Sequence, residues 1–168
     1  MPAPRNEDEL RTKVRDLMQD IGLCMFVTLD EQGRMRSRPM ALMGLDRDGK
    51  TAWFFTDGRT PKAQEIGHDG RVLLAFSSPS QQDYVSVYGQ ADVRRDAGKA
   101  KELWSEGARV WFPDGAESPN LALIAVTIEG AQYWDSPSST VIYAYGYAKA
   151  MLTGTPPDAA EVGRVSFG

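Results

Sequence analysis

The stretch Gly33-Arg34-Met35-Arg36-Ser37-Arg38-Pro39-Met40 places three arginines within five residues of a chain that is otherwise acidic. Side chains on a strand alternate between two faces, so the three arginines would share one face, while Met35, Ser37 and Pro39 would share the other. A row of like charges on one strand face is unfavourable unless water or an anion lies opposite. The stretch therefore has two interpretations: a solvated outer face, or an anion site. Phosphate suits the second, because the guanidinium fork matches its oxygens.

The segments next to this stretch predict a row of strands. Residues 23–29 (LCMFVTL) form a continuous apolar run that predicts a buried strand. The turn at 30–33 leads into the arginine strand, which we expect to continue to about Leu45. A second turn at 46–49 precedes a third predicted strand, 51–56 (TAWFFT). Three strands joined by tight turns predict an antiparallel meander.

Apolar periodicity and turn residues predict the remaining elements. A helix is expected over residues 7–20, capped by Asn6, and a short helix from Pro61 to about Ile66, with Thr60 as its N-cap. Residues 140–151 predict a strand, with a helix over 144–150 as the alternative. Further expectations are strands at 71–76, 83–93, 121–128, 131–134 and 162–167, a bend or bulge at Gly89, a helix at 96–105, an aromatic loop at 109–113 and a loop at 153–158.

Many short strands and few helices predict a mainly β (α+β) fold, an antiparallel barrel with peripheral helices. The 168 residues suit a single domain over 1–168. Within it, we expect a core at about 7–155 and a C-terminal tail at 153–168. The chain lacks βα alternation, a GxGxxG motif and a Walker A motif, which argues against a Rossmann or P-loop fold.

Composition excludes several classes of function. The net charge of −4 argues against nonspecific binding of nucleic acid. No apolar run approaches the roughly 20 residues that span a bilayer, and the N-terminus is polar, so we expect a cytoplasmic protein without a membrane partner. Cys24 and His68 are the only residues of their types. Hence we expect no metal centre and no His-dependent catalytic triad.

The start of the short predicted helix is a second possible anion site. Helix N-termini offer free N–H groups and the positive end of the helix dipole, and here Thr60 and Lys62 lie at that end. A plain N-cap with a solvated lysine is the alternative. Two anion signals within one short stretch of chain favour a phosphate ligand. Flat walls for a ring system could come from aromatic residues that could equally be core: Phe54, Phe55, Tyr84 and Trp111.

Several motifs, in this order and spacing, point to a known family. They are Arg36-Ser37-Arg38-Pro39-Met40, Phe54-Phe55-Thr56, Thr60-Pro61-Lys62, Tyr84-Val85-Ser86-Val87-Tyr88-Gly89, Glu102-Leu103-Trp104, Trp111-Phe112-Pro113, Tyr133-Trp134-Asp135 and Ala148-Lys149-Ala150 with Thr153-Gly154. Together they resemble the pyridoxamine 5′-phosphate oxidase-like superfamily of FMN-binding split β-barrels, and most closely its general stress protein 26-like branch. The resemblance covers about residues 7–155.

This resemblance implies a split barrel, FMN as the cofactor and a set of cofactor-binding residues. The arginine strand would contact FMN through Arg36, Ser37, Arg38, Pro39 and Met40. Phe55 and Thr56 would lie along the flavin, and Thr60 and Lys62 would bind its phosphate. The family forms homodimers with two flavins at the interface, and Trp111 is our candidate for a residue donated across it.

The chain also departs from the oxidases. They carry Ser-Arg-Lys where this chain has Thr60-Pro61-Lys62, and a glutamine where it has Tyr84. Their basic substrate-phosphate residues near the C-terminus have no counterpart here, so we do not expect a true pyridoxamine 5′-phosphate oxidase.

Three functions remain open. The first is an FMN-dependent oxidoreductase that uses a small-molecule electron donor or acceptor, with no residue assigned a catalytic role. The second is a non-catalytic protein that stores flavin or senses stress. The third is a reductase that binds deazaflavin F420.

Overall fold

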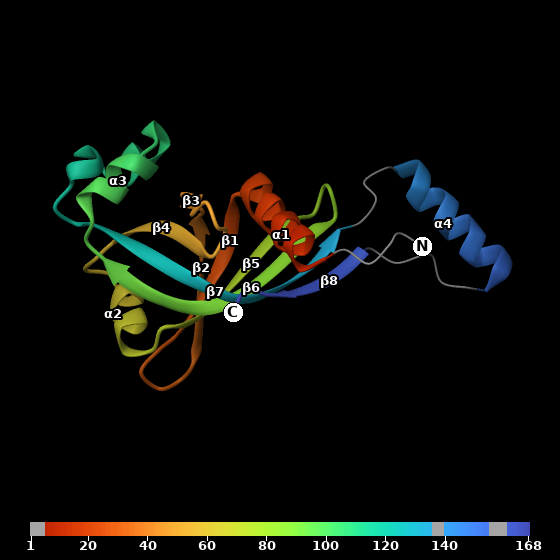
Figure 1. Cartoon of the computed structure of the whole chain (residues 1–168), viewed down its shortest axis with the longest axis horizontal. Helices are drawn as coiled ribbons and strands as arrows, with labels where there is room; N and C mark the ends of the chain where they lie inside the picture. The colour runs from red at the N-terminus through yellow and green to blue at the C-terminus, as the bar shows by residue number, and fades with distance from the viewer. Residues whose placement is uncertain (1–5, 136–139, 155–160) are drawn as a thin grey trace.

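The computed structural model of the chain describes residues 6–135, 140–154 and 161–168. The described strands are β1 (Leu23–Leu29), β2 (Met35–Ala41), β3 (Gly44–Leu45), β4 (Thr51–Asp57), β5 (Arg71–Ser78), β6 (Asp83–Arg94), β7 (Leu121–Asp135) and β8 (Glu161–Ser166). The helices are α1 (Glu7–Ile21), α2 (Pro61–His68), α3 (Ala97–Leu103) and α4 (Thr140–Thr153), with short 3-10 helices η1 (Glu106–Val110) and η2 (Gly115–Glu117). All pairings are antiparallel, in the order β2-β1-β5-β6-β7-β4-β3, and β8 pairs with β7. The sheet curls into a half-barrel (Figure 1), which confirms the predicted split-barrel class.

Helix α1 forms as its capping residues predict. The Asn6 side chain accepts a hydrogen bond from the Glu9 backbone N–H at 2.8 Å, and Gly22 ends the helix with φ of 70°. Such an N-cap stabilises a helix by about 1 kcal/mol. The buried side of α1 carries Val14, Leu17 and Met18, which join the main core inside the curled sheet.

The first part of strand β7, from Leu121 to Val126, is buried on both of its faces, which explains its continuous apolar run. Ile124 and Val126 lie in the main core, whereas Leu123 and Ala125 lie in a second cluster that α3 and η1 cover. We expected two strands here, but β7 continues without a break from Leu121 to Asp135. The predicted irregularity at Gly89 is confirmed, since the register between β6 and β7 shifts there.

The predicted meander is only partly right. β1 pairs with β2, and β3 with β4, but β2 and β4 are not neighbours in the sheet. The arginine strand ends at Ala41 rather than continuing to Leu45, and β4 pairs with β7 along its whole length. Turn residues specify local hairpins, whereas the pairing of β4 depends on residues about 70 positions away in the sequence, which local signals do not encode.

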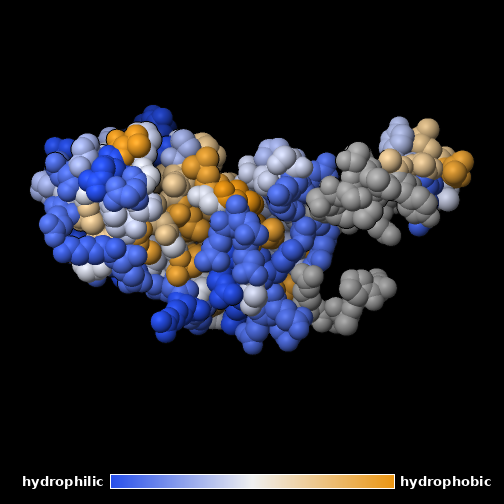
Figure 2. Space-filling view, turned by 90° about the horizontal axis from the view of Figure 1, so that it is seen from above, coloured by the Kyte–Doolittle hydropathy of each residue, from blue (hydrophilic) through white to orange (hydrophobic). Residues whose placement is uncertain are grey.

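Helix α4 corrects another expectation. Residues 140–153 form a helix, not the strand that their aromatic and β-branched residues suggested; the alternative we gave covers its centre. Its second half is rich in strong helix formers such as Ala, Met and Leu. Figures 1 and 2 show α4 set apart from the sheet, with its described apolar side chains exposed.

The C-terminal part of the chain returns to the sheet. The expected last strand is present as β8, which pairs with β7. Residues 155–158 of the loop expected at 153–158 lie outside the described residues. Among the described helices, none has the length and apolarity needed to cross a membrane.

Candidate functional site

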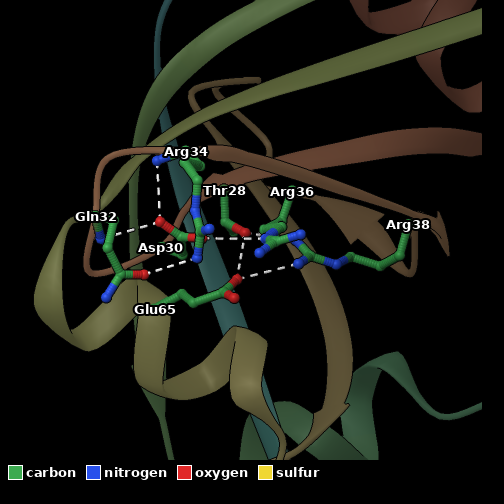
Figure 3. A network of polar contacts seen from close by, with 7 residues as sticks. All are labelled: Thr28, Asp30, Gln32, Arg34, Arg36, Arg38 and Glu65. Carbon is green, nitrogen blue, oxygen red and sulfur yellow. Dashed lines mark hydrogen bonds and ion pairs between the residues drawn. The ribbon is translucent and has the colours of Figure 1, made fainter.

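The three arginines of the opening stretch do share one face of the β1–β2 hairpin, with Arg34 directly before β2 and Arg36 and Arg38 within it. Register places Arg36 beside Thr28 and Arg38 beside Phe26, two residues whose side chains are buried inside the half-barrel. The arginine side chains therefore follow the inner face of the β1–β2 hairpin, and α2 lies next to them (Figure 3). The arginines and α2 lie side by side because α2 packs near β1, and not because of the meander we expected.

Asp30 holds the first two arginines. Its carboxylate accepts from Arg34 Nε at 2.9 Å and from Arg36 Nε at 3.1 Å. The backbone N–H of Arg34 is the largest cause that lowers the pKa of Asp30, to about 2, so this carboxylate stays ionised at neutral pH. The negative charge that a row of arginines requires is thus supplied in part by the chain itself.

Arg38 is held by different partners. Its Nη2 donates to Glu65 Oε2 at 3.0 Å, and its Nη1 donates to Thr28 Oγ1 at 2.6 Å and to the Phe26 carbonyl at 3.3 Å. Thr28 Oγ1 in turn donates to Glu65 Oε2 at 2.6 Å. The Arg38 and Glu65 side chains are only 24% and 15% exposed, so this ion pair is better shielded than a surface pair.

Lys62 is a cation without a partner among the described residues. It lies in the first turn of α2 and is half-buried, and its ammonium forms no hydrogen bond or ion pair within the described part of the chain. Burial, followed by the positive charge of Arg38, lowers the pKa of Lys62 from its usual value, while Asp57 acts in the opposite direction. A half-buried ammonium next to a guanidinium is unfavourable unless an anion joins them.

Thr60 occupies the predicted N-cap position but uses its hydroxyl differently. Oγ1 donates to the Asp57 carbonyl at 2.8 Å instead of accepting from a helix N–H, and it lies 3.4 Å from Thr56 Oγ1. The first turn of α2 is consequently not capped by a side chain. Its N-terminus retains the capacity to bind an anion that the sequence suggested.

The charges of the whole cluster do not balance. Arg34, Arg36, Arg38 and Lys62 supply four positive charges, and Asp30 and Glu65 supply two negative ones, so two positive charges remain. A phosphomonoester carries about −1.5 to −2 at pH 7. A single phosphomonoester would bring the cluster close to neutrality.

The other predicted residues of β2 divide between its faces. Met40 is buried on the inner face, whereas Ser37 and Pro39 are exposed on the outer face. The outer face continues across the sheet, because Ser37 pairs with Val27, Val27 with Leu73, and Leu73 with Tyr88. The large apolar side chains exposed on this outer sheet face are Leu23, Met25, Met35, Leu73, Tyr84, Tyr88 and Val162.

The predicted aromatic residues do not lie together. The Phe55 ring points away from the buried Thr56 side chain and packs against Trp104 and Phe112 below α3 and η1. Tyr84 lies on the outer sheet face, and Trp111 is 80% exposed beside η1. Within one chain, therefore, Thr56 and the arginines face inward, while Tyr84 and Trp111 are exposed.

Sequence reasoning missed the carboxylates and hydroxyl that hold the arginines, Asp30, Glu65 and Thr28. Asp30 could have been found, because it begins the turn that leads into the arginine strand. Thr28 was a visible signal too, as the only hydroxyl in the apolar run of β1. Glu65 gave no local signal, since its contact with Arg38 spans 27 positions of sequence.

Comparisons with known proteins agree with the fold and also identify the family. The family described as "Pyridoxamine 5'-phosphate oxidase like" matches residues 9–158, nearly the whole chain. The chain belongs to this family. Protein bli-3 of Neurospora crassa is 26% identical over 95% of this chain and 82% of its own length.

Two solved structures superpose on this chain. A protein described as a general stress protein 26, from Jannaschia sp. CCS1, superposes with a TM-score of 0.79 at 24% identity, over 95% of this chain and 99% of its own. The general stress FMN/FAD binding protein of Xanthomonas citri superposes with a TM-score of 0.66 at 30% identity, over 78% of this chain and 92% of its own. The Jannaschia structure is similar in fold. The Xanthomonas citri protein is a family relative, and its name includes a flavin.

Proposed function

We propose that this member of the family binds FMN, and that the inner face of the β1–β2 hairpin and the start of α2 hold its phosphate. The observation that carries the proposal is Lys62, a half-buried ammonium beside Arg38 that has no partner in the part of the chain that the structure describes. The excess of two positive charges in the cluster and the uncapped start of α2 support it. The residues present thus fit the phosphate of FMN, and relatives named for FMN or FMN/FAD binding make a flavin the ligand of choice.

In this proposal each site residue has a defined part. Lys62 and the free N–H donors of Arg38 bind the phosphate, the Thr60 hydroxyl lies at its edge, and Arg36 adds positive charge. Bound FMN supplies the electron-transfer chemistry, while the protein supplies binding and electrostatics. The chain would act as a flavin-dependent oxidoreductase with a small-molecule donor or acceptor. Flavin storage and stress sensing remain the non-catalytic alternative.

We further propose that two copies associate through the outer sheet face. This surface carries seven large, exposed apolar side chains, although single exposed apolar residues are the normal case for a monomer. Such a contiguous patch is typical of an interface core. In the dimer, Tyr84 and Trp111 of one copy would approach the flavin of the other, which accounts for their exposure in a single chain.

A spectrum of the purified protein tests the identity of the cofactor. We expect the absorbance of oxidised flavin, and release of FMN rather than FAD on denaturation. The shorter-wavelength band of a deazaflavin, or no bound chromophore together with no binding of added FMN, would contradict the proposal. Excess NAD(P)H without oxygen then separates the two functions, because a reductase bleaches the bound flavin rapidly and a storage protein does not.

A further inference from the structure

The network around Arg38 contains a hydroxyl that cannot touch a ligand. Thr28 is completely buried, and its Oγ1 accepts from Arg38 Nη1 and donates to Glu65 Oε2, both at 2.6 Å. The third side of this triangle is the 3.0 Å contact between Arg38 Nη2 and Glu65 Oε2 (Figure 3). Since ligand cannot reach it, Thr28 acts on a binding site only through Arg38 and Glu65.

The triangle fixes the direction in which Arg38 presents its remaining donors. A guanidinium has five N–H donors in one plane. Both hydrogens of Nη1 go to Thr28 and the Phe26 carbonyl, and one hydrogen of Nη2 goes to Glu65. Nε–H and the second Nη2 hydrogen have no partner among the described residues. Because the group is planar, fixing three donors fixes the direction of these two.

Glu65 forms no ion pair with Lys62 in the described structure. The two residues are three positions apart on α2, a spacing at which Lys and Glu often pair. Here Glu65 Oε2 accepts from both Thr28 and Arg38, and Lys62 has no ion-pair partner in the described structure. The triangle therefore orients the guanidinium and leaves the ammonium available.

We propose that Thr28 and Glu65 are positioning residues that aim Arg38 at the phosphate of the ligand, and thereby determine the preference for phosphorylated over unphosphorylated flavin. This inference rests on the proposed function, because it takes the phosphate of FMN as the anion. The inference goes beyond the proposed function, because it assigns the preference for phosphorylated flavin to a buried hydroxyl and a carboxylate that do not contact the flavin.

Thr28→Val tests the proposal without a change of charge or shape. Loss of the hydrogen bonds that Thr28 makes with Arg38 and Glu65 should weaken FMN binding by about 3- to 10-fold and leave riboflavin binding unchanged. Thr28→Ser keeps the hydroxyl and should retain the wild-type ratio of the two affinities. Glu65→Gln is less informative, since it removes both an anchor of Arg38 and a negative charge near the phosphate.

A double-mutant cycle separates positioning from general stability. In an Arg38→Ala background, Thr28→Val should leave the FMN-to-riboflavin ratio unchanged, because the group that it positions is gone. If Thr28→Val does not fold, Thr28→Ala removes the same hydroxyl and replaces it in the cycle.

Three results would overturn the proposal. The first is a Thr28→Val protein with the same ratio of FMN to riboflavin affinity as a wild-type protein that prefers FMN. This result would make the triangle a structural contact and leave the proposed function intact. The second is an equal loss for FMN and riboflavin. The third is a wild-type protein that binds neither flavin, which would remove the proposed function as well.

Discussion

The two faces of the β1–β2 hairpin have the same backbone and opposite surroundings. On the inner face, Arg34, Arg36 and Arg38 each have a carboxylate partner within the chain. On the outer face, Met25 and Met35 are exposed, and that surface continues to Leu73 and Tyr88. A strand period of two residues is enough to produce both surfaces from one sequence. In our account the inner face binds the ligand phosphate and the outer face binds a second copy.

The largest expected effect is on the stability of the dimer, and it comes from a substitution on the outer face. Leu73→Asp would bury an unpaired carboxylate in the proposed interface, which costs several kcal/mol. Weakening of the dimer by more than about 100-fold should follow, at about 1.4 kcal/mol per decade. Sedimentation analysis measures it, with Ala97→Asp on α3 as a control that adds the same charge away from this face. A Leu73→Asp protein as dimeric as the control would show that the outer face is not the interface.

The next largest expected effect is on FMN affinity, and it comes from a substitution on the inner face. Lys62→Ala removes a charge-assisted contact worth about 1.5–3 kcal/mol, so FMN binding should weaken by about 10- to 150-fold. Riboflavin, which has no phosphate, should bind as before. Lys50→Ala is the matched control, because Lys50 is an exposed lysine in the turn before β4 and the net charge changes equally. Calorimetric titration with both flavins measures the ratio; equal losses for the two would place the phosphate elsewhere.

The pH dependence of FMN binding is a second test of the inner face. Because burial and Arg38 lower the pKa of Lys62, its ammonium loses its proton at a lower pH than an ordinary lysine does. Phosphate is already a dianion above neutral pH. FMN affinity should thus fall as pH rises through the lowered pKa, with proton uptake on binding in that range. Lys62→Arg should remove this fall, because arginine stays charged; an identical pH dependence in both proteins would argue against Lys62 as the titrating group.

The same lowered pKa has a small effect on the ligand-free fold. A lysine that binds its proton less tightly when folded destabilises the fold where the unfolded chain is protonated. Stability without FMN should consequently rise slightly with pH between the folded pKa of Lys62 and its usual value. Screening by solvent reduces this gain in stability, since Lys62 is only half-buried.

The smallest effect tests the aromatic residue donated across the interface. Trp111→Ala should weaken FMN and riboflavin equally, by a factor of about 2 to 10, the range for one aromatic ring contact. Fluorescence titration of both flavins measures it. A loss confined to FMN would mean that Trp111 acts on the phosphate site instead of the ring.

The sequence predicted those features that depend on neighbouring residues. Asn6 and Glu9 located the start of α1, Thr60 and Pro61 located the start of α2, and Gly89 located the bulge. Strand alternation placed the three arginines on one face. The split-barrel class followed from the order of family motifs, which depends on the chain as a whole.

Long-range packing accounts for what the sequence did not predict. The pairing of β4 with β7 and the contact between Arg38 and Glu65 join distant positions. The Phe55 ring packs below α3, and because β4 is buried on both faces, its apolar run carries no alternation to show which way this ring points. The capacity of Asp30 and Glu65 to neutralise the arginines became visible only in three dimensions.

The preference of the wild-type protein for FMN over riboflavin tests the central claim most directly. Two charge-assisted contacts to one phosphate, from Lys62 and Arg38, should together make FMN bind on the order of 10² to 10⁴ times more tightly. Calorimetric titration of cofactor-free protein at low ionic strength measures both constants. A ratio in that range that declines as salt is added is the result we predict. Equal affinities for the two flavins would contradict the assignment of the inner hairpin face as the phosphate site.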